Sequence, residues 1–524
     1  MMARFRCTFA VLTTCLAGCA TPASQSPSAP ARAGTPHIVV DGAFDDWRGV
    51  PASVSTSNNA PTPTVHSAWT SADGEALFLR FALSSPVVLQ AHDAATRIVI
   101  DVDGLAATGA DIDGLEGADV VLEFSPAPAN GGTRGGFVAR TATGTTGTAH
   151  DVGYTGLPTH LSDTFEARIE RATLEAFAGV KLGAGPRARI VSDAGGGAPV
   201  APGIVAWNPP PPARVALAAE ADAIERAPGT DVRVVQWNVA DRTIRERPDA
   251  FVRVLRALAP DVLLLDELPA TIDDAELGTF LARLGPDWSF ALGAGGGRQR
   301  AAVASRLPLE PAPDFERVAY PDSVTALLPL ATFPQTRRDL TTALQDGISA
   351  AGAYVELAGG RVLFVAVDLA CCGGAESVED RFRRIQADAI NRAARAAVGR
   401  RDDISAIVVG GDFNLVGSRR PLEILGQSGP PVSARLRLQP VHALQLDGRT
   451  AATWRQDGPF GPGRLDWILY SPWSLAPLRA FVFESRDLSG AALERLGVRA
   501  DDSDHTSDHL PVVADLRRSA PVRQ

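Results

Sequence analysis

An aspartate and an asparagine stand two residues apart where an apolar stretch of this chain ends. Residues 408–411 read Val-Val-Gly-Gly, and Asp412, Phe413 and Asn414 follow directly. The apolar residues predict a buried strand and the glycines a tight turn, and alternation along an extended chain would point Asp412 and Asn414 the same way. A carboxylate beside a carboxamide suits phosphate-ester hydrolysis, because one group activates water while the other donates to a phosphoryl oxygen. A strand that ends in an Asp/Asn turn is also common without any chemistry.

Four further segments place polar side chains at the end or in the middle of predicted apolar strands. The segments are residues 232–238, 261–267, 464–469 and 507–516. The polar residues of interest in these segments are Asn238, Asp266, Glu267, Asp466, Asp508 and His509. Such an oxygen-rich set suits a hard divalent ion such as Mg²⁺, which binds one or two carboxylates together with water and a substrate phosphate. A buried acid is costly unless it is paired, which favours a couple between Asp466 and His509.

Residues 231–517 resemble the endonuclease/exonuclease/phosphatase superfamily, because the ordered motifs WN, DE, GGDFN, LDWIL and SDHLP span nearly the whole region. The motifs are specific to the superfamily and to no single member. The resemblance implies an α/β four-layered sandwich, in which two packed mixed β-sheets are flanked by helices. It also implies a phosphoester hydrolase that depends on Mg²⁺ or Mn²⁺, with a phosphodiester as the favoured substrate.

The resemblance assigns roles to all of these polar residues except Asp266, which stands where many relatives have a glutamine. Asp412 would orient or deprotonate the attacking water, and Asn414 would bind the phosphoryl oxygens. His509, paired with Asp466, would stabilise charge in the transition state. Each residue also has an alternative as a turn residue, a strand end or a satisfied buried acid. The residues implied to place the metal are Glu267, Asn238 and Asp508.

One position departs from the family pattern. Hydrolases of this family usually carry a histidine after the strand at residues 362–367, and here Asp368 stands in its place. An imidazolium donates to the phosphate, whereas an ionised carboxylate repels it. Asp368 is therefore expected to be protonated, to serve as an extra metal ligand, or to mark a weakened enzyme, unless the strand is misaligned. The third case leaves open an alternative function, namely a catalytically weak or inactive member of the fold that binds a ligand or partner.

Two adjacent cysteines, Cys371 and Cys372, follow that position. Adjacent cysteines either close a strained and easily reduced disulfide or remain as two packed thiols, and the sequence leaves both open. Two sulfur atoms without further cysteines or a nearby histidine are a poor zinc site, because tetrahedral zinc requires four ligands.

The charge of the chain argues against a nucleic-acid substrate. The formal net charge is −10, and no arginine-rich stretch interleaved with aromatic residues is present. Nucleic-acid binding depends mainly on basic contacts to phosphate, so an acidic chain is poorly suited to it. Nucleic acid is therefore not the favoured partner, and small or lipid phosphoesters remain open.

The first residues predict export and attachment to a membrane. Arg4 and Arg6 precede an apolar run at residues 9–16, which is too short to span a bilayer. The following Leu-Ala-Gly-Cys resembles the bacterial lipoprotein processing box, which implies lipidation of Cys19 and an outer-membrane lipoprotein in the cell envelope, facing the periplasm or the surface. The predicted segments are a signal peptide at 1–19, a flexible tether at 20–36, a β-sandwich at 37–205, a Pro-rich linker at 206–230 and the hydrolase domain at 231–518.

The region at 37–205 has short alternating strands and turn signals, which predict an all-β sandwich. It resembles the family 9 carbohydrate-binding modules through diffuse motifs around Trp47, Trp69 and the aspartates after residue 100, which implies carbohydrate as a partner. Trp47 and Trp69 are candidates for stacking on a sugar, although core tryptophans are commoner. Four aspartates are candidates for holding Ca²⁺, although a solvated turn is an alternative because EF-hand spacing is absent. They are Asp101, Asp103, Asp111 and Asp113.

Overall fold

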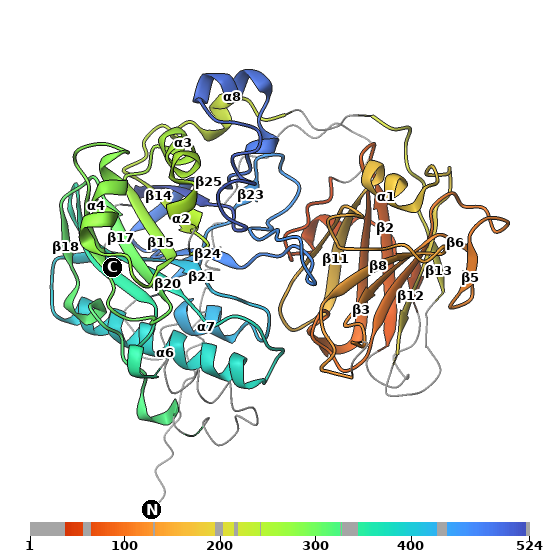
Figure 1. Cartoon of the computed structure of the whole chain (residues 1–524), viewed down its shortest axis with the longest axis horizontal. Coiled ribbons are helices and arrows are strands. Elements are labelled where there is room, and N and C mark those ends of the chain that lie inside the picture. Colours follow the sequence, from red (N-terminus) through yellow and green to blue (C-terminus); the bar gives the residue numbers. More distant parts are fainter. Residues whose placement is uncertain are drawn as a thin grey trace, which may run out of the picture.

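The computed structural model of this chain has two lobes (Figure 1). It describes residues 37–55, 64–128, 131–193, 203–213, 218–241, 243–324, 326, 344–426 and 437–519. The predicted signal peptide, Cys19 and the tether lie outside these residues. No helix of the described part is both long enough and apolar enough to cross a membrane.

The N-terminal lobe is a sandwich of two antiparallel sheets. The first sheet has the order β1-β2-β3-β11-β10, with β1 (Val54–Ser55), β2 (Val65–Ala72), β3 (Ala76–Val87), β11 (Ser162–Glu170) and β10 (Tyr154–Leu157). The second has the order β13-β12-β4-β7-β8-β9, with β13 (Ile204–Ala206), β12 (Arg187–Ser192), β4 (Thr96–Asp101), β7 (Val120–Phe124), β8 (Phe137–Thr141) and β9 (Thr146–Gly147). The short strands β5 (Ala110–Ile112) and β6 (Leu115–Ala118) and the helix α1 (Arg171–Ala178) complete it. The expected all-β sandwich is confirmed.

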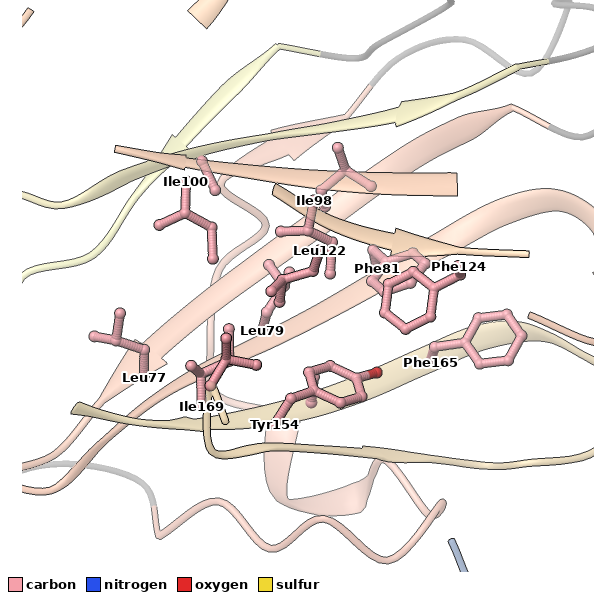
Figure 2. Packing of buried hydrophobic residues seen from close by; sticks show 14 of the residues in the cluster. Leu77, Leu79, Phe81, Ile98, Ile100, Leu122, Phe124, Tyr154, Phe165 and Ile169 are labelled. Carbon is pink, nitrogen blue, oxygen red and sulfur yellow. The ribbon is translucent and has the colours of Figure 1, made fainter. Parts of the chain in front are cut away.

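The core of the sandwich follows from the alternation of its strands. Leu77, Leu79 and Phe81 on β3 are spaced by two and therefore point to one face, where they pack against Ile98 and Ile100 of the other sheet (Figure 2). These side chains are 0% exposed. Burying each stabilises the fold by roughly 1.5–3 kcal/mol relative to exposure, before conformational entropy is counted.

The C-terminal lobe contains two mixed sheets. One has the order β16-β17-β15-β14-β26-β25-β23, with β16 (Ser289–Leu292), β17 (Gln299–Ser305), β15 (Val262–Pro269), β14 (Val232–Asn238), β26 (Val512–Arg518), β25 (Leu475–Val482) and β23 (Leu444–Gln445). The other has the order β18-β19-β20-β21-β24-β22, with β18 (Leu309–Pro311), β19 (Ala350–Leu357), β20 (Gly360–Asp368), β21 (Ile404–Asp412), β24 (Asp466–Tyr470) and β22 (Gln439–Pro440). The pairs β14–β15 and β20–β21 are parallel, so each pair ends at one edge of its sheet.

Three apolar clusters divide this lobe into four layers. One cluster lies between the two sheets and includes Val234 and Phe364. A second joins the outer face of the β14 sheet to α3 (Pro248–Leu258), α4 (Asp274–Ala282) and α8 (Gly490–Leu496). A third joins the outer face of the β21 sheet to α6 (Val378–Gly399) and α7 (Arg420–Gly426). The expected four-layered α/β sandwich is confirmed, and its inner strands are apolar on both faces because both are covered.

Candidate active site

Strand register places three aspartates side by side. The parallel pair β20–β21 sets Asp368 opposite Asp412, and the antiparallel pair β21–β24 sets Asp412 opposite Asp466. Side chains of laterally paired residues share one face of a sheet, so register alone brings the three carboxylates together. In the facing sheet, β14 and β15 pair Asn238 with Asp266.

Asp412 is held by two asparagines. Its Oδ1 accepts the Asn414 backbone N–H at 2.8 Å, and its Oδ2 accepts Nδ2 of Asn414 at 2.9 Å and of Asn238 at 3.3 Å. Asp412 is only 2% exposed. Burial raises the pKa of Asp412 to about 8, with the Asp466 and Glu267 carboxylates acting in the same direction. The geometry therefore fixes the carboxylate in one orientation.

Asn414 meets Asp412 through a turn, and the expectation that alternation along an extended chain aligns them is wrong. Strand β21 ends at Asp412, and Asn414 has φ of +47°, in the left-handed region that asparagine tolerates. Its amide nitrogen also donates to the Leu369 carbonyl at 2.8 Å. Both amide hydrogens are thus used within the protein, and in this conformation Asn414 orients Asp412 rather than facing outward to a phosphoryl oxygen.

His509 and Asp466 form a buried couple. His509 Nδ1 donates to Asp466 Oδ2 at 2.8 Å, and Nε2 lies 3.8 Å from Asp412 Oδ2. Thr453 Oγ1 donates to the same Asp466 oxygen at 2.7 Å, and Gln236 Nε2 donates to the other at 3.1 Å. Burial opposes a charged imidazole, but the Asp466 and Asp412 carboxylates outweigh it and raise the pKa of His509. Asp466 therefore turns the free ring nitrogen of His509 toward Asp412.

Glu267, Asp368 and Asp412 each offer an oxygen within 4.8 Å of the other two. Glu267 reaches this position because β15 carries a bulge between Leu265 and Leu268, where Glu267 has φ of +52°. A bulge re-aims a side chain out of the regular alternation. Burial raises the pKa of Glu267 and of Asp368, and their neighbouring carboxylates add to it. A cation between the three oxygens would offset that repulsion, and the all-oxygen donor set fits Mg²⁺ or Mn²⁺.

The other two residues expected to place the metal lie nearby and outside that three-oxygen group. Asn238 donates to Asp412, and its Oδ1 accepts the Ala240 backbone N–H at 3.0 Å. Asp508 accepts the Trp454 indole N–H at 3.1 Å. Asp508 and Glu267 line the same cleft, which has a volume of about 690 Å³.

Four site residues were missed or underrated from the sequence. Gln236, Thr453 and Trp454 hold Asp466 or Asp508 from other segments of the chain, and no local pattern marks them. Asp266 is fully buried, and burial followed by repulsion from Asp466 raises its pKa well above the ordinary range. The Asp412 backbone N–H donates to Asp266 at 3.3 Å, so Asp266 belongs to the packing beneath the site.

The Cys371 and Cys372 thiols are free and exposed. The disulfide alternative is therefore not the state of this structure, and neither thiol is packed in the core. They follow Asp368, where the chain leaves β20 toward α6.

In the N-terminal lobe, only two of the four aspartates that were candidates for holding Ca²⁺ lie together. Asp101 and Asp103 do come together, and their third partner is Asp119. Asp113 instead pairs with Arg97, whose Nε donates at 2.7 Å, and Asp111 lies exposed on β5. Asp119 was not among the four candidates, and it lies beside Asp101 because β4 and β7 are paired in the sheet.

Trp47 and Trp69 were candidates for stacking on a sugar, and neither is presented for that role in the structure. Trp47 is 1% exposed, and its indole N–H donates to Glu166 Oε2 at 2.8 Å in the core. Trp69 is half-buried, and the Arg80 guanidinium covers its ring at 4.3 Å from the centroid. Stacking on a carbohydrate needs an open aromatic face, so these two residues do not supply one here.

The C-terminal lobe matches a known protein family. Residues 235–509 match the model of the Endonuclease/Exonuclease/phosphatase family. No curated protein matches the chain. Many solved structures are similar, and three of them follow. The catalytic domain of human Nocturnin with bound sulfate is 17% identical, with a TM-score of 0.37, over 56% of this chain and 96% of that one. ANGEL2, a 2',3'-cyclic phosphatase, is 16% identical, with a TM-score of 0.38, over 56% and 96%. An endonuclease/exonuclease/phosphatase from Bacteroides vulgatus is 16% identical, with a TM-score of 0.36, over 55% and 100%.

Proposed function

The chain belongs to the endonuclease/exonuclease/phosphatase family, and from this premise we propose that it is a metal-dependent hydrolase of phosphoesters, with phosphodiesters favoured. One observation carries the proposal. Asp412 is fixed by Asn238 and Asn414 and faces the imidazole of a His509–Asp466 couple. A positioned carboxylate beside an oriented imidazole is what water activation and charge stabilisation at phosphorus require.

The metal would be held by Glu267 and Asp368, with Asp412, Asn238 and Asp508 beside them. Mg²⁺ or Mn²⁺ bound there would supply polarisation of a phosphoryl oxygen and a lowered pKa for water. Asp368 replaces the histidine that is usual in the family, and its place among the three oxygens supports the extra-ligand interpretation over an inactive enzyme.

The chain's own residues carry the proton movements. Asp412 accepts a proton from the attacking water, because Asn238 and Asn414 fix its carboxylate in one orientation. His509 donates a hydrogen bond to the oxygen on which charge develops, and Asp466 keeps Nδ1 protonated so that Nε2 faces the reaction. Gln236 and Thr453 fix Asp466 in turn.

The composition of the cleft supports a small substrate over a nucleic acid. Six of its lining residues are acidic, and they are Asp241, Glu246, Glu267, Asp457, Asp504 and Asp508. Two of its three arginines, Arg455 and Arg486, are engaged with Asp504 at 2.8 and 3.3 Å. A polyanion gains affinity from unengaged basic groups along its path, and this cleft favours a compact phosphoester instead.

The test is hydrolysis of a phosphoester panel by the purified protein with and without Mg²⁺ or Mn²⁺. The panel holds bis-p-nitrophenyl phosphate, p-nitrophenyl phosphate, DNA, sphingomyelin and inositol phosphates. Asp412→Asn is expected to lower metal-dependent turnover by roughly 10²–10⁴-fold, as removal of a general base does. The matched control is Asp388→Asn on the exposed face of α6, which should leave turnover unchanged. Metal binding without turnover on any substrate would favour the alternative of a binding-only member of the fold.

We also propose that the protein works in the cell envelope as an outer-membrane lipoprotein anchored through Cys19. The proposal rests on the Leu-Ala-Gly-Cys sequence after a short apolar run. Cys19→Ser should abolish incorporation of labelled palmitate and release the protein from the membrane fraction. Unchanged labelling of the variant would contradict it.

A further inference from the structure

The β-sandwich contacts the loop that carries Asn414. Thr159 Oγ1 donates to the Leu415 carbonyl at 2.9 Å, and the Leu161 backbone N–H donates to the Gly417 carbonyl at 2.8 Å. Both acceptors lie within three residues of Asn414, which orients Asp412. The N-terminal lobe is thus hydrogen-bonded to the turn beside the candidate base.

It also contacts the loop that leads into Asp466. The Phe137 backbone N–H donates to the Pro459 carbonyl, and the Gly461 backbone N–H donates to Gln90 Oε1 at 2.7 Å. A Cβ at Gly136 would lie 2.2 Å from the Pro459 carbonyl oxygen, so the close approach there requires glycine.

A third contact joins the start of the described chain to the hydrolase lobe. Val40 exchanges backbone hydrogen bonds of 2.9 Å with Arg449 and Ala451, and Asp41 lies 2.8 Å from His442. Val40 and Ala451 share an apolar cluster with Trp47. Three separate contacts fix the orientation of one lobe relative to the other, because a single contact would leave rotation free.

In this orientation the sandwich presents His150 to the cleft that adjoins the candidate active site at Glu267 and Asp508. The turn that carries His150 is anchored by Ala149 and Val152, which are 2% and 0% exposed in the sandwich core. The Thr148 backbone N–H donates to Asp151 Oδ2 at 2.8 Å and closes the turn. His150 itself is exposed, and it lines the same cleft as Glu267 and Asp508.

The lining of the cleft shows what kind of group it accepts. Among the described residues that line it, all except Ala240 are polar or charged, and His150 is the one from the sandwich. A volume of about 690 Å³ is in the range of small-molecule sites. Apolar side chains normally line a site for an acyl chain or a large aromatic group, so this cleft suits a polar, hydroxyl- or amine-bearing alcohol.

We propose that His150 is a specificity-determining residue, which hydrogen-bonds the polar alcohol group of the phosphoester while the hydrolase lobe holds its phosphate. The proposal rests on the proposed function, and it makes the sandwich part of the active site. The imidazole offers one donor and one acceptor, so it can contact a hydroxyl or an amine without a charge of its own.

The test compares His150→Ala, His150→Gln and His37→Ala on two p-nitrophenyl phosphodiesters whose second alcohol is glycerol or ethanol. His150→Ala should raise KM for the glycerol ester roughly fivefold, the worth of one neutral hydrogen bond, with kcat and the ethyl ester little changed. His150→Gln keeps a donor and an acceptor and should restore most of the affinity. His37 is an exposed sandwich histidine outside the cleft lining, and His37→Ala should behave as the unmodified protein.

A binding arm separates this inference from the proposed function. Affinity for the glycerol ester is measured by calorimetry in Asp412→Asn, with and without His150→Ala. Turnover that is identical in the unmodified protein and in His150→Ala on both esters would overturn the role of His150 and leave the hydrolase intact. If neither the unmodified protein nor any variant turns over either ester, the proposed hydrolase function fails. In that case the binding measurement decides on His150: an unchanged dissociation constant would overturn its role, and a roughly fivefold larger one would support it.

Discussion

Asp368 decides how this site differs from the family pattern. Its pairing with Asp412 across β20 and β21 places it in the site, so a misaligned strand does not explain it. It lies within 4.8 Å of Glu267 and Asp412 oxygens, and burial raises its pKa. A half-buried carboxylate that faces two others is unfavourable unless it is protonated or bridged by a cation. If a metal binds there, Asp368 would supply a third carboxylate to it in place of the phosphate-binding imidazole.

The variant Asp368→Asn distinguishes two roles of Asp368, that of a metal ligand and that of a protonated structural acid. The amide keeps the shape of the protonated carboxyl group, so a purely structural Asp368 would tolerate it. If Asp368 is a ligand, affinity for Mn²⁺ should fall roughly tenfold or more, because the site loses one of three charges. Calorimetric titration of Mn²⁺ measures it, with Asp388→Asn on exposed α6 as the control. Equal affinity in Asp368→Asn and the unmodified protein would exclude the ligand role.

At the scale of elements, the buried pair of Arg233 and Asp515 ties the centre of one sheet to its helical layer. Arg233 on β14 donates to Asp515 on β26 at 2.6 and 2.8 Å. Its other amino group donates to the Ile224 and Leu258 carbonyls, which end η2 (Ala221–Ile224) and α3. Arg233 is 2% exposed, so water cannot replace these contacts.

Arg233→Met should lower the free energy of unfolding by about 3–5 kcal/mol, because it leaves Asp515 buried without its cation. Chemical denaturation measures the change. The exposed pair Arg392–Asp388 on α6 provides the control, and Arg392→Met should cost less than about 1 kcal/mol. Arg233→Met combined with Asp515→Leu should recover part of the loss, since it removes the unpaired charge. If Arg233→Met alone is as stable as the unmodified protein, the Arg233–Asp515 pair is dispensable for stability.

The sequence predicted the elements better than their partners. The apolar runs that stop at Asp412 and Asn238 correctly predicted two strands and their ends, because an apolar run and its end are local properties of the sequence. The bulge that re-aims Glu267 depends on pairing with β17, and Thr453 finds Asp466 only through the folded sheet. Such contacts are set by tertiary packing, and no spacing along the chain encodes them.

At the scale of the whole molecule, Glu166 of the sandwich binds the segment around Asp41, which contacts both lobes. Glu166 Oε1 accepts the Asp41 and Gly42 backbone N–H groups at 2.9 and 2.8 Å, and Oε2 accepts the Trp47 indole N–H. Asp41 in turn contacts His442 of the hydrolase lobe. Burial raises the pKa of Glu166 to about 8, despite these three donors. A change in its protonation therefore acts where the two lobes meet.

The stability of the protein should depend on pH through this group. The pKa of Glu166 is raised from an ordinary 4.5 to about 8 on folding, so the folded state binds the proton more tightly. The associated stability is fully present below about pH 4.5 and is lost as pH rises through about 8. Each tenfold difference in proton affinity is worth about 1.4 kcal/mol, so the shift corresponds to a few kcal/mol, and the opposing effect of the hydrogen bonds is already contained in the pKa of about 8.

Glu166→Gln removes the titration, and the informative quantity is the slope of stability against pH rather than stability itself. The amide nitrogen of glutamine would face the Trp47 indole N–H, which costs a hydrogen bond at every pH. Urea unfolding between pH 5 and 8 should therefore show a decline in the unmodified protein that is shallower in Glu166→Gln. Identical slopes would mean that Glu166 is ionised throughout and that its three donors outweigh burial.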